Sequence, residues 1–342
     1  MSGARHREQG GRRTESLKSK GSEGSSGGGF GLPADEPAIL RGQASAREML
    51  RALRQEEETA RRTGELEHPG RDLLLAVGDS WFAYWPHGDI LDGLQARHGW
   101  HVRNHSRGGW SLCEMLYDKA WHLADTPPSP LPAPDGTAVR DFARTLQSLP
   151  AAERERLRAV LVSGGGNDVA GGSDPAHAAP AVLRLVRPRD GGALLDEAAL
   201  ADLIDTRLRA LLATLLATIA QLCTDILGRV PPIVVHGYAH PVPDGRGAFG
   251  RGWLKPALVE RGYDQLEDRS AVMAALIDRL NDMQRDLIAS NAPFATARHL
   301  DLRPLLRNDA RYREDWQNEL HPTIGPGFDR LAARFDEFCR TL

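Results

Sequence analysis

The chain has 342 residues, 41% of them apolar and 26% charged, and 43 Lys+Arg against 46 Asp+Glu leave a net charge of −3. This balance argues against a nucleic-acid or anionic membrane partner, because neutralising many phosphates requires a basic excess. The three cysteines, Cys113, Cys223 and Cys339, are too few for a disulfide framework or a four-thiolate zinc site. We expect a soluble globular protein that acts on a small molecule; its oligomeric state stays open.

The first 35 residues are predicted to form a disordered, basic, Gly/Ser-rich tail. Residues 1–29 contain only three apolar side chains, and six Lys or Arg outnumber three Glu. Such a stretch buries too little apolar surface to offset the entropy lost on ordering. It also lacks the apolar run of a secretory signal peptide, so we expect a cytoplasmic protein.

Residues 36–70 are predicted to form an amphipathic helix followed by a linker. Ser45 and Glu48 have the spacing of a capping box, which predicts a helix from Ala46 to Arg62. Its apolar stripe is narrow, which favours a helix on the surface of the main domain or of a partner.

From residue 71 to 342, short apolar runs alternate with helical patterns. The runs predict strands at 73–77, 101–104, 159–162, 233–235 and 294–302. The helical patterns fall at 88–98, 111–123, 138–148, 196–227, 270–290 and 326–340. Because parallel neighbours need crossover connections, this alternation predicts an α/β fold. We expect one domain, a three-layer α/β/α sandwich with a mostly parallel sheet of about five strands.

Two further features of this region are a long uncharged stretch and two insertions. Ala210–Thr224 is uncharged, but a bilayer span takes roughly 20 residues, so we expect a buried helix and no membrane span. Residues 169–195 and 240–265 are long insertions, which in α/β proteins often border the substrate site. Phe249, Trp253 and Tyr263 in the second insertion are candidates for a lid.

Polar residues follow three of the predicted strands, at 78–80, 104–111 and 164–168, and a further polar group lies at 318–322. Ligands of an open parallel sheet bind beyond the carboxyl ends of its strands. Phe82 stands where the G-x-S-x-G elbow of α/β-hydrolases has its second glycine. The glycine run at 164–166 lacks the remaining features of a dinucleotide or phosphate loop, which argues against a nucleotide.

Four blocks together resemble the SGNH (GDSL-type) hydrolase superfamily. They are GDS at 78–80, N-x-x-x-x-G at 104–109, GGND at 165–168 and HPT at 321–323, in that family's order. The resemblance covers the whole predicted domain. It implies a flavodoxin-like sandwich and a serine esterase or lipase that needs no cofactor and no metal.

The resemblance also implies roles for individual residues. Ser80 would be the nucleophile, His321 the general base, and Gly109 and Asn167 donors of the oxyanion hole, with Gly108 as the neighbouring alternative to Gly109. A serine hydroxyl needs an imidazole to take its proton, and the developing oxyanion needs preorganised donors. Taken singly, each residue also has a structural interpretation: Ser80 as a helix cap, Asn167 as a turn residue and His321 as a loop residue.

One position departs from the family pattern. Asn318 stands three residues before His321, where the family usually has an aspartate. Three alternatives follow: Asn318 orients the ring through its carbonyl, Asp315 or Glu319 supplies the charge, or Ser80 and His321 act as a dyad. Of the two carboxylates, Asp315 is the preferred candidate. In serine proteases the aspartate orients the imidazole and stabilises the imidazolium.

The substrate is not specified by these residues. Trp81, Phe82, Tyr84, Trp85 and Trp110 lie beside the predicted catalytic groups, and any that line the cleft would favour an apolar acyl chain or a sugar face. Ester hydrolysis through an acyl-Ser80 intermediate is the expected reaction. A non-catalytic ligand-binding member of the same fold, an acyltransferase or a thioesterase are the alternatives.

Overall fold

A computed structural model describes residues 35–56, 71–85, 87–119, 132–170, 182–247 and 252–342. The predicted tail, apart from Asp35, and the predicted linker after residue 56 lie outside these ranges.

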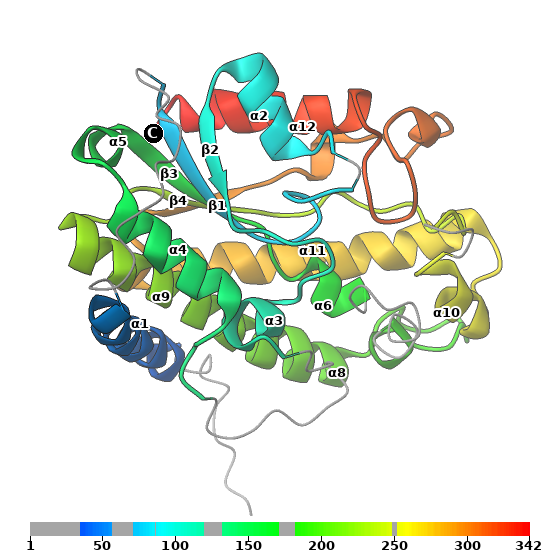
Figure 1. Cartoon of the computed structure of the whole chain (residues 1–342). Coiled ribbons are helices and arrows are strands. Elements are labelled where there is room, and N and C mark those ends of the chain that lie inside the picture. Colours follow the sequence, from blue (N-terminus) through cyan, green and yellow to red (C-terminus); the bar gives the residue numbers. More distant parts are fainter. Residues whose placement is uncertain (1–34, 57–70, 86, 120–131, 171–181, 248–251) are drawn as a thin grey trace, which may run out of the picture. The chain divides into compact units, whose positions relative to one another are not determined.

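Five strands form one parallel sheet in the order β2-β1-β3-β4-β5 (Figure 1). They are β1 (Leu73–Val77), β2 (His101–Asn104), β3 (Leu157–Val162), β4 (Ile233–His236) and β5 (Ala297–Leu300). All five predicted strands are present; the last is shorter than predicted because Ala292–Phe294 forms a 3₁₀ turn. The strand order reverses direction between β1 and β3, which is where sheets of this kind form a ligand-binding crevice.

Helices cover both faces of the sheet, as the sequence predicts (Figure 1). One face carries α2 (Ile90–His98) and α12 (Pro326–Cys339); the other carries α3 (Leu112–Tyr117), α4 (Thr137–Ser148), α9 (Arg209–Leu227) and α11 (Leu266–Ser290). The fold is therefore a three-layer α/β/α sandwich. Short helices also occupy stretches for which the sequence predicted none, among them α5 (Ala151–Arg156), α6 (Gly166–Ala170) and α10 (Lys255–Glu260).

The predicted long helix over 196–227 is continuous, built from α8 (Glu197–Asp202), a π-helical turn (Leu203–Leu208) and α9. Among the described residues it is the one helix long and apolar enough to cross a membrane by length and composition. In its most apolar window 61% of the residues are buried inside the protein, as in the core helix of a soluble fold.

The N-terminal helix α1 (Glu36–Glu56) begins ten residues before the predicted start, so Ser45 lies inside it and the predicted capping-box start is wrong. Its first half packs on α9, where Arg209 Nε donates to Asp35 Oδ1 at 2.8 Å in a buried salt bridge. The Thr218 hydroxyl donates to the Gly42 carbonyl at 3.2 Å. These contacts between helices extend α1 in a way that the local capping pattern could not indicate.

Candidate active site

Ser80 lies in the turn that directly follows β1, and it is 9% exposed. Gly78 allows this turn to pass the end of β3, because a Cβ at residue 78 would lie 2.6 Å from the Ser163 Cβ. The Asp79 Oδ1 atom accepts a hydrogen bond from the Trp81 amide at 3.0 Å and fixes the turn. The nucleophile candidate is thus held at the carboxyl edge of the sheet.

Asp79 connects this turn to the ends of β3 and β4. Its Oδ1 also accepts from the Ser163 hydroxyl at 2.7 Å, and its Oδ2 accepts from the Tyr238 hydroxyl at 2.5 Å. Ser163 follows β3 and Tyr238 follows β4. Burial, followed by the charge of Asp79, raises the pKa of Tyr238, so the phenol stays protonated and donates. The sequence analysis gave neither Asp79 nor Tyr238 a role; the only signal was the aspartate inside the GDS block.

His321 lies in the loop before α12, and its Nε2 atom is 2.8 Å from the Ser80 Oγ atom. A heavy-atom distance of about 2.6–3.2 Å is within reach of direct proton transfer. The Trp81 indole donates to the Leu320 carbonyl at 3.1 Å, which joins the serine turn to the histidine loop. Burial lowers the pKa of His321 to about 3, so the imidazole is neutral near pH 7.

Asn318 orients the His321 ring. Its Oδ1 atom accepts from the backbone amides of Leu320 and His321, both at 2.9 Å, and lies 3.1 Å from the His321 Nδ1 atom. The two amide donors require an acceptor, so the oxygen of the Asn318 side chain faces the ring. Nδ1 then carries the hydrogen and Nε2 is free to accept the Ser80 proton. Of the three alternatives left by the sequence, this geometry matches the Asn318 carbonyl.

The two carboxylates considered for the same role make their hydrogen bonds elsewhere. Asp315 Oδ2 accepts from the Arg307 amide at 2.7 Å and from Arg330 Nη1 at 2.5 Å. Glu319 is fully buried and accepts from three backbone amides at 2.8–3.0 Å, those of Gly245, Leu254 and Lys255. Glu319 therefore anchors the second insertion, and the sequence-based preference for Asp315 among the carboxylates finds no support in these contacts.

Tyr84 contacts both Asn318 and His321. Its hydroxyl accepts from Asn318 Nδ2 at 3.3 Å, and its ring centroid lies 4.5 Å from that of His321. Other members of the aromatic group after Ser80 differ: Trp81 and Phe82 are buried, while Trp85 is 83% exposed. For Tyr84, the only signal in the sequence was its position close to the GDS block.

The second insertion also reaches the histidine. The Trp253 ring lies edge-on to His321 at 6.3 Å between centroids. Tyr263 is buried, and Phe249 lies outside the described residues. Of the three lid candidates, Trp253 is the one that the structure places at the site.

The loop after β2 carries the first oxyanion candidates. Asn104 Nδ2 donates to the Phe82 carbonyl at 2.7 Å, which holds this loop against the serine turn. Gly109 has φ +85°, a conformation that favours glycine. A Cβ at Gly108 would lie 3.9 Å from the Ser80 Cβ, so this loop passes beside the nucleophile. The backbone amides of both glycines stay candidates for the oxyanion hole.

Asn167 lies in the first turn of α6, directly after β3. Its Nδ2 atom donates one hydrogen to the Trp110 carbonyl at 3.0 Å, and an amide nitrogen has a second hydrogen to offer an oxyanion. Beside it, Asp168 Oδ2 accepts from the Leu112 amide at 3.0 Å. Two hydrogen bonds therefore tie the loop after β2 to the loop after β3. Burial raises the pKa of Asp168 to about 7.

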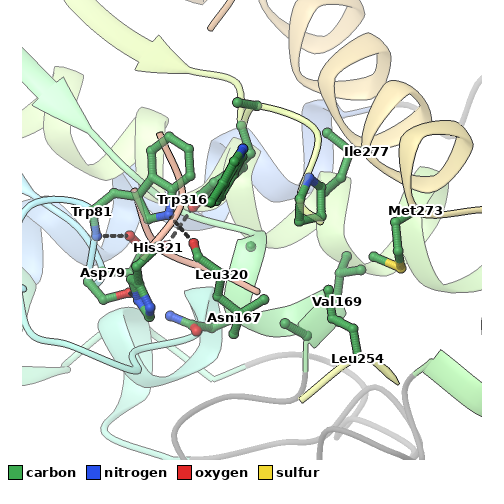
Figure 2. A pocket seen from close by; sticks show the side chains of 16 residues that line it. Asp79, Trp81, Asn167, Val169, Leu254, Met273, Ile277, Trp316, Leu320 and His321 are labelled. Carbon is green, nitrogen blue, oxygen red and sulfur yellow. Dashed lines mark hydrogen bonds between the residues drawn. The ribbon is translucent and has the colours of Figure 1, made fainter. Parts of the chain in front are cut away.

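One pocket at the carboxyl edge of the sheet is lined by Ser80, Asn167 and His321 (Figure 2). Within the described ranges, no group of three or more His, Cys, Asp or Glu side chains is arranged to hold a metal ion. The arrangement offers a neutral base on a serine hydroxyl and an amide donor beside it, which are the requirements of acyl transfer.

A scan against protein-family models finds no match, and a search of the curated proteins finds none. Among solved structures, 27 chains match. One is a Streptococcus pneumonia protein whose name refers to platelet activating factor, with 13% identity, 89% of this chain and 95% of that chain covered, and a TM-score of 0.43.

Two further matches are named as hydrolases. A GDSL-like lipase from Bacteroides thetaiotaomicron has 11% identity, coverage of 87% of this chain and 98% of that one, and a TM-score of 0.33. An acetylxylan esterase from Geobacillus stearothermophilus has 12% identity, coverage of 78% and 94%, and a TM-score of 0.35. The names of the similar structures include a GDSL-like lipase and an SGNH-hydrolase family esterase.

Proposed function

We propose that the protein is an SGNH-type serine hydrolase that cleaves a carboxylic ester through an acyl-Ser80 intermediate. The observation that carries this proposal is the 2.8 Å separation of His321 Nε2 and Ser80 Oγ, with Asn318 fixing the tautomer of the ring. Ser80 lies at a strand end, where a smaller polar group than histidine would satisfy the hydrogen bond of its hydroxyl. A neutral histidine held against this hydroxyl therefore supports a chemical role.

In the acylation step, His321 Nε2 takes the Ser80 proton while Oγ attacks the ester carbonyl carbon. The carbonyl oxygen becomes negative and accepts hydrogen bonds from Asn167 Nδ2 and from the backbone amide of Gly109 or its neighbour. When the intermediate collapses, the bond from carbon to the alkoxide oxygen breaks. The proton on Nε2 passes to that oxygen, and the alcohol leaves.

In the deacylation step, water takes the place of the alcohol. His321 Nε2 removes a proton from water, the hydroxide attacks the acyl-Ser80 carbon, and the proton returns to Ser80 Oγ as the acid is released. A thioesterase or an acyltransferase would form the same acyl-Ser80 intermediate and would differ in the leaving or accepting group.

The test is to incubate the protein with a fluorophosphonate probe and with p-nitrophenyl esters, beside Ser80→Ala and His321→Ala. We expect stoichiometric labelling at Ser80, located by mass spectrometry, and a loss of turnover of at least about 10³-fold in both variants. Absence of labelling together with absence of Ser80-dependent turnover would refute the proposal and favour the non-catalytic alternative.

A further inference from the structure

The pocket beside Ser80 continues past Asn167 into an apolar region. We call Val169, Leu254, Met273 and Ile277 the aliphatic slot; all four line the pocket that Ser80, Asn167 and His321 also line. Figure 2 shows Asn167 between His321 and these four side chains. An acyl group attached to Ser80 with its oxygen at Asn167 would therefore have the slot in front of it.

The slot is built from three parts of the chain. Val169 follows Asn167 by two residues in α6, and Leu254 belongs to the second insertion, where its amide donates to Glu319 at 2.8 Å. Met273 and Ile277 are four residues apart on α11, so their side chains lie on one face of that helix. The walls are thus fixed by the elements that also position the catalytic groups.

Within the part of the chain that the structure describes, the slot offers no partner for a charged acyl group. Among the described residues that line the pocket, the acidic or basic side chains are Asp79 and His321. Both Asp79 oxygens already accept hydrogen bonds, and His321 is engaged by Ser80 and Asn318. A carboxylate or phosphate on the acyl chain would lose water without gaining a cation, which is costly.

The length of the slot follows from α11. Met273 and Ile277 are four residues apart, or about 6 Å along the helix, which an extended chain of about four to five methylene groups would cover. Each methylene group that leaves water for such a surface contributes about 0.8 kcal/mol, equivalent to about fourfold in kcat/KM.

We propose that the aliphatic slot binds the acyl part of the substrate and selects an uncharged acyl chain longer than acetyl. This inference rests on the proposed function. It assigns Val169, Leu254, Met273 and Ile277 as the residues that determine acyl specificity. It also places the acyl chain on aliphatic side chains, while Trp81 is the member of the aromatic group after Ser80 that is found in the lining of the same pocket.

The experiment measures kcat/KM for p-nitrophenyl acetate, butanoate, hexanoate and octanoate. We expect a rise of about fourfold per methylene from acetate to hexanoate, followed by a plateau. The mono-p-nitrophenyl ester of succinic acid has the same number of acyl carbons as the butanoate. We expect it to be slower than the butanoate by more than about tenfold, because its free carboxylate is unpaired in the slot.

A matched pair of variants tests the residues. Ile277→Ala removes part of the slot wall, and we expect the ratio of hexanoate to acetate kcat/KM to fall several-fold. Leu276→Ala is the control. Leu276 directly precedes Ile277 in α11 and is fully buried, but it does not line the pocket. It should preserve the ratio. Met273→Ala repeats the test in case Ile277→Ala does not fold, and fluorophosphonate labelling of Ser80 reports which variants are folded.

The outcomes separate the two proposals. A flat or falling chain-length profile with intact Ser80-dependent turnover would overturn the slot and leave the esterase proposal standing. An equal change of the ratio in Ile277→Ala and Leu276→Ala would also overturn the slot. If neither labelling nor Ser80-dependent turnover is found with any ester, both proposals fall.

Discussion

The serine side and the histidine side of the site each contain a buried carboxylate near a proposed catalytic residue, and the two carboxylates have similar roles. Asp79 precedes Ser80 and binds Tyr238 and Ser163, whereas Glu319 lies two residues before His321 and binds the backbone of the second insertion. Neither contributes a hydrogen bond to the imidazole. Both negative charges hold loops in place, while the ring is oriented by a neutral amide.

This contrast explains the electrostatics of the site. In the serine-protease arrangement a buried carboxylate stabilises the imidazolium that forms during the reaction. Here the imidazole is buried and its hydrogen-bond partner Asn318 is neutral. Burial therefore lowers the pKa of His321 to about 3. The site therefore orients the base well but gives little stabilisation to its protonated form. Substitutions on one side at a time separate the two contributions.

The largest effect is expected from Asn318→Ala, which removes the acceptor at Nδ1 and frees the ring to adopt the wrong tautomer. In serine proteases a tautomer error costs about 10⁴-fold in kcat, and we expect a loss of about 10²–10⁴-fold here. Steady-state kinetics with a p-nitrophenyl ester measures it, with the folded state checked by thermal unfolding. A loss of less than threefold would mean that the amide does not orient the ring.

Asp79→Asn tests the serine side. The new amide would place a donor opposite the Tyr238 or Ser163 hydroxyl, and a buried unsatisfied polar group costs about 1–3 kcal/mol. We expect a fall in the free energy of unfolding of this size together with slower labelling of Ser80. Glu319→Gln is the matched control on the histidine side. It should lower stability similarly while the labelling rate changes less, and equal changes in both variants would contradict the separate positioning role of Asp79.

Asn318→Asp would remove the contrast by giving the imidazole a charged partner. A charge-assisted hydrogen bond exceeds a neutral one by about 1–1.5 kcal/mol, so we expect kcat to rise by about tenfold. The carboxylate favours the imidazolium, so the pKa of His321 rises by about one to three units. Because only the neutral ring acts as base, the acid limb of kcat/KM moves to higher pH. The wild type should stay level down to about pH 4. A pH profile in which both proteins coincide would contradict this prediction.

The smallest effect is expected from Tyr84→Phe. This variant removes the hydroxyl that accepts from Asn318 Nδ2 but keeps the ring against His321. A hydrogen bond of net value about 0.5–1.5 kcal/mol predicts a two- to tenfold loss in kcat, with little change in KM. Tyr84→Leu, which also removes the aromatic contact, should lose more, and an equal loss in both would assign the effect to the ring alone.

Much of the fold was predictable because β1, β3 and β4 are short, largely apolar runs and because helical periodicity was strong. The start of α1 was missed because contacts with α9, such as Arg209 with Asp35, determine it. Ser80, Asn167 and His321 were found because each follows a strand or precedes the last helix within a motif. Tyr84, Asp79 and Tyr238 were missed because their roles depend on partners up to 234 residues away, which no local pattern encodes.

The hydrogen bond from the Trp81 indole to the Leu320 carbonyl joins positions 239 residues apart in the chain. While a ribosome is still extending this chain, β1 and its serine are present long before the histidine loop exists. In the proposed mechanism, Ser80 therefore has no base until the loop that carries His321 is folded onto the sheet. Contacts of such long range also form slowly. Labelling of Ser80 during refolding would consequently act as a clock for the final stage of folding, since only a completed molecule can react.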